Sequence, residues 1–205
     1  AIRYWQKIGK RTRLSVDANY LKADGDYPFT LKNGSVTTEE KRINSDVESW
    51  QGEVNLFHTF RDDSELSAKA YYYKSERGLP GAIILYNSAS DERLWDENFF
   101  AQARYKKVFS PKWSLQAQGK YNYSWNKYED LGPQYTDGKQ TDTNRQKEYY
   151  LSASALYRPN EWLSFSLSQD GAINKLHTNG LNSPEPTRYT SLTALNARIQ
   201  TKQVK

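Results

Sequence analysis

The stretch of residues 113–125, WSLQAQGKYNYSW, constrains the fold of this chain more than any other. Its odd-numbered residues are apolar, aromatic or glycine throughout, and its even-numbered residues are polar throughout. This alternation is typical of a β-strand with one face in an apolar medium and the other in water. The stretch is far longer than an ordinary strand of about 5–6 residues. Aromatic residues, Trp113 and Trp125, lie at both ends of its apolar face.

A strand of this length and pattern is typical of a bilayer crossing, with aromatic side chains at the two membrane interfaces. With a rise of roughly 3.3 Å per residue and a tilt of about 40°, the stretch would extend about 30 Å along the membrane normal. The alternative, which this stretch alone leaves open, is a long twisted strand in a soluble β-sandwich.

Composition favours a polar β-protein that is rich in aromatic residues. The mean hydropathy is low, at -0.94, but the 16 Tyr, 7 Phe and 6 Trp argue against disorder. A barrel with a wet lumen and a thin apolar band has this composition. The chain has no apolar run of about 18 residues, so we expect no transmembrane helix. It has no Cys, which excludes disulfides, thiolate chemistry and Cys-based zinc sites in these residues.

The ends and the charge of the chain add two expectations. The chain starts at Ala1 and contains no Met, which predicts a processed chain or a fragment. The formal net charge of +5 comes from basic residues dispersed among 24 acids. This dispersion argues against a nucleic-acid-binding surface.

The same alternation recurs along the chain and predicts an all-β protein. We expect strands at 1–8, 14–20, 50–56, 66–72, 99–105, 113–125, 149–157, 163–167 and 195–199. We expect short turns at 9–11, 61–64, 109–112 and 158–161, and long connections at 24–46, 75–96, 127–146 and 174–188. Short and long connections alternate strictly, which is typical of an antiparallel transmembrane β-barrel with tight turns on its periplasmic side.

The two faces of these strands predict which side meets lipid. We place Tyr20, Trp50 and Trp125 near the outer interface, and Trp113, Tyr157 and Trp162 near the inner one. The polar faces carry seven charged residues that we expect to line a lumen: Asp17, Glu53, Lys69, Arg104, Lys106, Lys120 and Arg198. About eight strands close only a narrow barrel. We therefore expect one arc of a larger barrel, completed by further residues or by further chains, because open strand edges are not tolerated in lipid.

Several segments resemble a known family. They are residues 18–29, the tyrosine-rich 70–73, the RGLPG segment at 77–81, and residues 82–87 and 93–100. Together they are similar to the barrel of TonB-dependent outer-membrane receptors of the Bacteroidetes type. Within that family they look most like the receptors for vitamin B12.

The resemblance implies a barrel of roughly 22 strands that holds an N-terminal plug domain. It implies uptake across the bacterial cell outer membrane, driven by the TonB complex through a motif near the N-terminus. The chain contains neither the plug nor that motif, so residues 1–205 are expected to be an interior segment of the barrel domain. The implied partners are a small nutrient, outer-membrane lipid and lipopolysaccharide, the TonB complex through the plug, and a surface lipoprotein that caps the loops. Nucleic acid is not among them.

We find no catalytic constellation and predict that the chain is not an enzyme. His58 and His177 belong to no H-E-x-x-H motif, and no G-x-S-x-G motif or phosphate-binding glycine loop is present. Ligand binding by the long connections is the remaining function. The candidate ligand-binding residues are Tyr27, Phe29, Tyr86, Arg93, Trp95, Tyr128 and Tyr135. The alternative is that these aromatic residues pack the loops against each other.

Asp24 and Asp26, which flank Gly25, are candidate Ca²⁺ ligands, because oxygen-rich loops can hold this ion. The segment does not match an EF-hand loop, and solvated loop acids are the alternative. No other cofactor is predicted.

The sequence thus predicts a segment of a TonB-dependent receptor that takes up a scarce nutrient, with vitamin B12 or a related corrinoid as the leading cargo. A receptor for a ferric siderophore or a glycan is the nearest alternative. A passive porin, an outer-membrane enzyme and a soluble β-sandwich adhesin are further alternatives.

Overall fold

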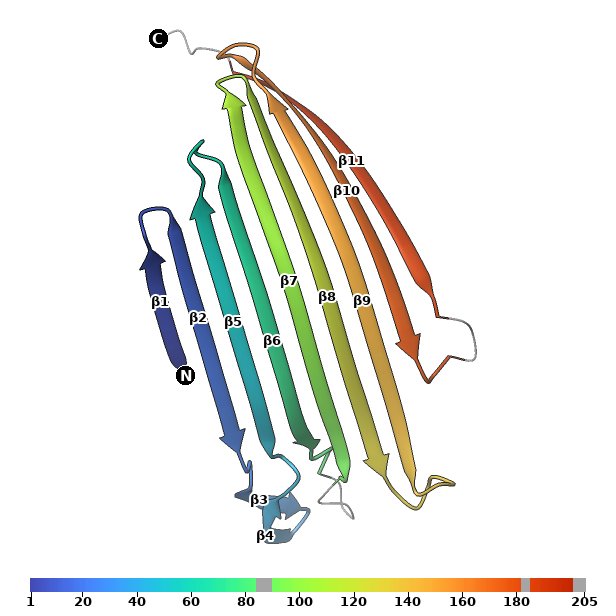
Figure 1. Cartoon of the computed structure of the whole chain (residues 1–205). Helices are drawn as coiled ribbons and strands as arrows, with labels where there is room; N and C mark the ends of the chain where they lie inside the picture. Colours follow the sequence, from blue (N-terminus) through green and yellow to red (C-terminus); the bar gives the residue numbers. More distant parts are fainter. Residues whose placement is uncertain (84–89, 182–184, 201–205) are drawn as a thin grey trace.

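The structure is a computed structural model that describes residues 1–83, 90–181 and 185–200. Every regular element in these ranges is a β-strand (Figure 1). The strands are β1 (Ile2–Ile8), β2 (Thr12–Ala23), β3 (Tyr27–Asn33), β4 (Val36–Arg42), β5 (Val47–Thr59), β6 (Glu65–Leu79), β7 (Glu92–Ser110), β8 (Trp113–Leu131), β9 (Lys139–Tyr157), β10 (Leu163–Thr178) and β11 (Thr187–Ile199). The described residues form no helix that is long and apolar enough to span a membrane.

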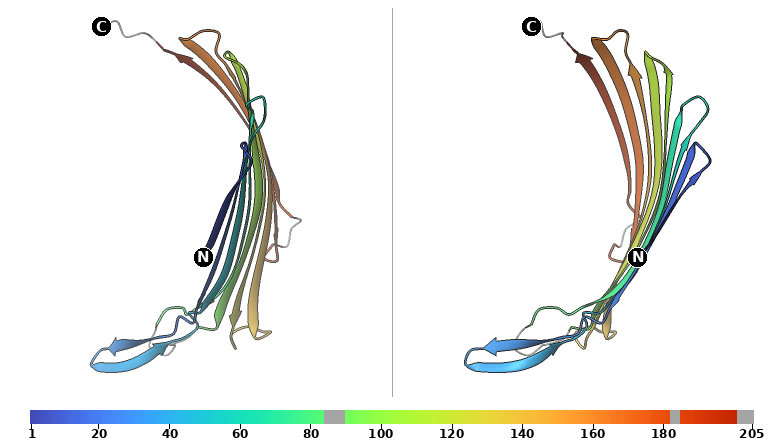
Figure 2. Two further views of the ribbon diagram at one scale, coloured as in Figure 1. Left: turned by 60° about the vertical axis from the view of Figure 1, so that its left-hand side comes forward. Right: turned by 90° about the vertical axis from the view of Figure 1, so that its left-hand side faces the viewer.

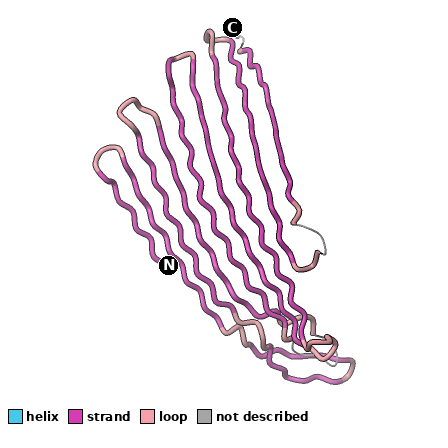
Figure 3. Tube along the Cα trace, turned by 45° about the vertical axis from the view of Figure 1, so that its right-hand side comes forward, coloured by secondary structure: helices cyan, strands magenta, loops and turns pink. Residues whose placement is uncertain are grey.

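Nine strands form one antiparallel sheet in the order β1-β2-β5-β6-β7-β8-β9-β10-β11. Each strand pairs with the next strand of the sheet along the chain, through short turns and longer connections in alternation (Figure 3). The pairing between β7 and β8 shifts register only at Val108/Ser110. Within the described residues, β1 and β11 each pair on one side, so the sheet is open at both edges.

Three strand pairs extend further than their alternation predicts. β8 and β9 stay paired up to Leu131 and Lys139, although we predicted a loop over 127–146. We predicted a connection over 75–96, but β6 continues to Leu79 and β7 begins at Glu92. The connection predicted over 174–188 is also shorter, because β10 and β11 extend into it. These predictions were wrong because polar residues are frequent on both faces of the strands there, so the hydrophobic alternation ends while the backbone pairing continues. The alternation of shorter and longer connections is kept.

The predicted connection 24–46 contains a hairpin of its own, β3–β4. Gly34 and Ser35 form its two-residue tip, and Gly34 has a φ of 59°, which suits a glycine at the first central position of a hairpin turn. The Asn33-Gly34 pair thus joins the last residue of β3 to the first residue of the turn. The pair is a turn signal in the sequence, but the flanking residues lack a clear apolar alternation. Figure 2 shows the hairpin projecting from the end of the sheet, towards the side to which the sheet bends.

The sheet has an apolar face and a polar face, and these names are kept below. The apolar face carries Leu14, Val54, Leu66, Ala103, Tyr121, Leu151, Leu167 and Leu195, and the residues that alternate with them form the polar face. No apolar side chain is buried among the described residues, and Leu151 and Leu195 are 71% and 78% exposed. A β-sandwich would cover this face with a second sheet. Within the described residues the other sheet is the β3–β4 hairpin, which does not pack on this face.

Aromatic residues mark the two ends of the apolar face. Near the longer connections, the rings of Tyr20 and Trp50 lie 4.2 Å apart, measured between centroids. Near the short turns, Trp113 stacks on Tyr157 at 4.3 Å. Both pairs join residues that the sequence assigned to the same end, and cross-strand aromatic pairs of this kind contribute about 0.2–1 kcal/mol each.

Candidate functional site: the polar face and its rim

The charged residues predicted to share one face do share it. In the paired strands, Asp17 lies opposite Glu53, and the neighbouring strands carry Lys69 and Lys120 on the same side. Glu53 forms an ion pair with Lys69 at 2.7 Å, and Asp17 forms one with Arg3. The polar face is therefore a surface of partly compensated charges, which needs water or another polar surface against it.

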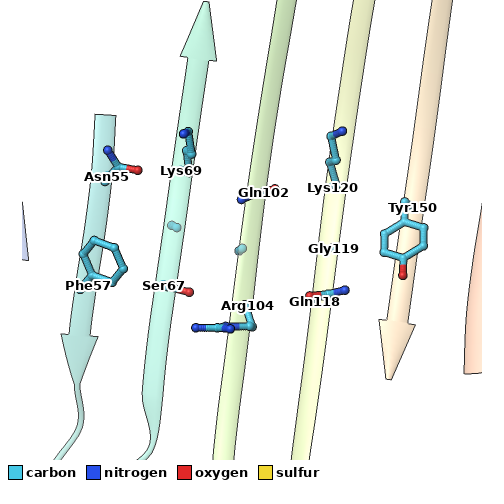
Figure 4. Close-up of a pocket in the computed structure, with 12 residues that line it drawn as sticks. Asn55, Phe57, Ser67, Lys69, Gln102, Arg104, Gln118, Gly119, Lys120 and Tyr150 are labelled. Carbon is cyan, nitrogen blue, oxygen red and sulfur yellow. The ribbon is translucent and has the colours of Figure 1, made fainter. Parts of the chain in front are cut away.

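The polar face is hollowed in its middle. This hollow has a volume of about 520 Å³. Figure 4 shows Lys69, Arg104 and Lys120 on three neighbouring strands around it, together with side-chain amides. Lys69 is neutralised by Glu53, whereas Lys120 lies over the ring of Phe100, with its Nζ 5.3 Å from the centroid. Within the described residues Arg104 has no ion pair, so the hollow is positively charged and can accept anionic or hydrogen-bonding groups.

The structure, and not the sequence, shows which residues line this hollow. Gln102, Gln118 and Asn55 look like ordinary polar positions of alternating strands, and no motif marks them. Only the register across five strands brings them together, and the register cannot be derived from one strand at a time.

Two predicted ligand-binding tyrosines meet at the rim of the polar face. Burial raises the pKa of the Tyr128 hydroxyl, and the Glu92 carboxylate beside it raises this pKa further. The hydroxyl of Tyr135 donates to Asp130 Oδ2 at 2.5 Å, and this bond raises its pKa as well. Both hydroxyls therefore stay protonated donors at neutral pH. We call Tyr128, Tyr135, Glu92 and Asp130 the rim cluster.

Arg93 and Trp95 lie on the opposite face from Tyr128. Trp95 faces the Lys127 ammonium at 4.5 Å, and Lys127 in turn pairs with Glu129. Successive residues of a strand point to opposite faces, and Leu94 is the direct partner of Tyr128. The predicted ligand-binding set is thus divided between two faces of the sheet, because the residues were assigned to a loop and are in fact in paired strands.

Arg93 has structural partners. Its guanidinium forms two hydrogen bonds to the Asp46 carboxylate, at 3.2 and 2.8 Å, and one to Glu76 at 2.9 Å. Asn44 donates to the carbonyl of Glu92 at 2.9 Å and to that of Ser90. We call residues 42–46 the rim clamp, because they fasten the base of the β3–β4 hairpin to the start of β7.

The remaining candidates lie on or beside the hairpin. Tyr27 and Phe29 are both in β3, and Tyr27 is 53% exposed. Tyr86 lies outside the described residues. Asp26 forms an ion pair with Lys41 at 2.8 Å. Among the described residues no group of three or more His, Cys, Asp or Glu is placed to hold a metal ion. Ca²⁺ binding by Asp24 and Asp26 therefore stays a prediction from the sequence.

The rim clamp should depend on pH. The bonds from Arg93 lower the pKa of Asp46 below its usual value of 3.8. A carboxylate whose pKa is lowered in the folded state contributes stability that is present above the unfolded pKa of about 3.9 and is lost as the pH falls through the lowered value. We expect hydrogen-exchange protection of residues 42–46, corrected for intrinsic rates, to hold down to about pH 4 and to fall below it.

The control for this pH dependence is Asp46→Asn. It should show weaker protection at neutral pH, because the ion pair is absent, and a flatter profile in acid. An unchanged profile in this variant would show that another group, and not Asp46, controls the clamp.

Comparison with known proteins identifies no family for this chain: no family model matches its sequence, and no curated protein matches it either. Its function has to be inferred from its own residues. These provide an apolar face without protein cover, a polar face with a basic hollow, and a rim of tyrosines and acids.

Proposed function

We propose that this chain is a wall segment of an outer-membrane β-barrel, with its apolar face against lipid and its polar face towards a wet lumen. The observation that carries the proposal is the single-layer sheet, whose apolar face has exposed side chains from Tyr20 in β2 to Leu195 in β11. Apolar surface left in water costs about 25 cal/mol per Å² relative to its burial. A bilayer would cover this face, while the polar face would stay hydrated.

The open edges fit the same proposal. Lipid provides no hydrogen-bonding partner for the free edges of β1 and β11, so a spanning sheet has to close. Closure requires further strands, from the rest of a longer polypeptide or from other chains. The short connections, such as 9–11 and 111–112, would then face the periplasm, and the β3–β4 hairpin with the rim clamp would face the outside.

We further propose that the barrel is a TonB-dependent receptor and that its cargo is a corrinoid such as vitamin B12. The family resemblance of residues 18–29, 77–81 and 93–100 supports this assignment. The strand lengths agree with it, because β7, β8 and β9 have 19 residues each, whereas about 9–11 suffice to cross a bilayer. The excess would carry the rim cluster above the membrane, where cargo arrives.

In this proposal the chain binds and guides but makes or breaks no bond. Cargo would contact the outer connections and the plug, and force from the TonB complex would rearrange the plug to release it inward. The basic hollow around Arg104 and Lys120 would face the plug or the passing cargo. Its charge would favour acidic groups on either of them.

Titration of the intact parent protein, purified in detergent, with cyanocobalamin tests the cargo. We expect saturable binding at nanomolar ligand. Binding should weaken in Tyr27→Ala, which removes an exposed hairpin ring, and should persist in Lys32→Ala, a change in the same strand without an aromatic ring. Titrations with and without Ca²⁺ test the predicted role of Asp24 and Asp26. Absence of binding with Ca²⁺ present would exclude the corrinoid as cargo and favour a siderophore or a glycan. The proposal that the chain is part of a barrel would not be affected.

A further inference from the structure

Three cations gather on the apolar face near its longer connections. Lys147 lies directly opposite Lys175, and Arg145, two residues along β9, lies opposite His177. All three basic side chains are exposed. Because alternate residues share a face, they follow Tyr149 of β9 and Ile173 of β10 on the same side of the sheet. The cations thus lie where the apolar and aromatic surface ends.

These cations lack the partners that similar residues have elsewhere on this face. Lys22 pairs with Glu48 at 3.8 Å, and Lys127 with Glu129 at 2.7 Å. Glu185 pairs with His177 at 2.8 Å. Within the described residues no carboxylate lies within ion-pair distance of Arg145, Lys147 or Lys175. Like charges directly opposite each other destabilise a sheet, so Lys147 and Lys175 would gain from an anion between them.

The apolar surface beside the cations indicates what carries that anion. Lys147 is also the partner of Tyr123, and Arg145 is the partner of Trp125, so aromatic rings flank the cations on β8. Aromatic side chains mark the headgroup level of a membrane. A ligand whose acyl chains lie along Leu151 and whose phosphate groups lie at Lys147, the next residue on this face after Tyr149, would contact the apolar and the basic surface at once.

We propose that Arg145, Lys147 and Lys175 bind the phosphate groups of a phosphorylated lipid headgroup in the outer leaflet. This site lies on the outside of the proposed barrel and is separate from the rim cluster and the basic hollow. The proposal rests on the proposed membrane location of the chain. It does not depend on the cargo. The ligand class is a phosphorylated glycolipid of the lipid A type, because such a headgroup presents two phosphates to these three cations directly above its acyl chains, whereas a diacyl glycerophospholipid presents one.

The test is a titration of delipidated parent protein in detergent with lipid A and with its dephosphorylated form. Each basic residue near an anionic lipid surface strengthens binding by roughly fivefold. We therefore expect Lys147→Gln with Lys175→Gln to weaken lipid A binding by roughly 25-fold. Lys22→Gln is the matched control, because Lys22 lies on the same face but pairs with Glu48. It should bind as the unchanged protein does. Lys147→Arg with Lys175→Arg should retain binding, which separates loss of charge from misfolding.

Other outcomes would overturn the proposal. Equal lipid A affinity of the double Gln variant and the unchanged protein would exclude these residues as the site. Displacement of lipid A by excess inorganic phosphate would reveal an exchangeable anion site rather than a lipid site. Failure of the protein to fractionate with the outer membrane would instead reject the proposed function. The two failures are therefore distinguishable.

Discussion

Leu151→Arg should destabilise the parent barrel by about 2–4 kcal/mol, the cost of an arginine that faces the middle of a bilayer. Leu151 is 71% exposed on the apolar face, between Gly119 and Gly171 of the neighbouring strands. Because both directly opposite residues are glycines, no side chain directly opposite shields an introduced guanidinium from lipid. Urea unfolding of the parent protein in lipid vesicles, monitored by the shift in gel mobility, measures the change in the free energy of unfolding.

Ser154→Arg is the matched control. Ser154 belongs to the same strand but to the polar face, opposite Gln116 and Ser168, so we expect its change to stay within about 1 kcal/mol. Leu151→Ala separates lipid from a protein core. A core cavity costs roughly 2–5 kcal/mol, whereas lipid chains fill the space and the cost should be smaller. Equal tolerance of both arginine variants would show that the apolar face does not meet lipid.

The sequence predicts the faces of this sheet well because period-two alternation is a local signal. Residues 113–125 alternate without exception, and the structure places them in β8 with the predicted sides. The order of strands also follows, because the four short turns leave little choice of neighbour and the longer connections continue the same antiparallel order. Strand ends are harder to predict. Residues 127–130 have no apolar alternation, so nothing in their pattern separates a paired strand above the apolar band from a loop.

The candidate site was harder to predict from the sequence, because its residues lie where the strand ends could not be predicted. Tyr128 and Trp95 are close in register, yet a one-residue offset sends them to opposite faces. Aromatic residues that were grouped by belonging to connections therefore separate once those connections are strands. The rim clamp was missed altogether, since Asn44 and Gly78 meet only through the pairing of β5 with β6.

The rim clamp leads to the second large effect, in which Gly78→Val should release residues 42–46 from the sheet. A Cβ on Gly78 would come within 2.4 Å of the carbonyl oxygen of Asn44, which is backbone and cannot rotate away. The clamp would then lose the bond from the Gly78 amide to the carbonyl of Asp46, now 2.9 Å. The Asn44 contacts to the start of β7 would be lost with it.

We expect hydrogen-exchange protection of residues 42–46 to fall by about 100-fold in Gly78→Val, since two or more bonds of roughly 0.5–1.5 kcal/mol each open together. Gly52→Val is the control, because a Cβ on Gly52 meets nothing within 4 Å. Protection of residues 42–46 should be unchanged in Gly52→Val. Unchanged protection in Gly78→Val would mean that side-chain bonds hold the segment, among them the Arg93–Asp46 pair and the bond from Arg42 to the carbonyl of Gly81. Arg93→Gln combined with Gly78→Val should then lower the protection, because no other described side-chain bond ties Asp46 to β7. The base of the hairpin is thus fixed by backbone fit first and by charge second.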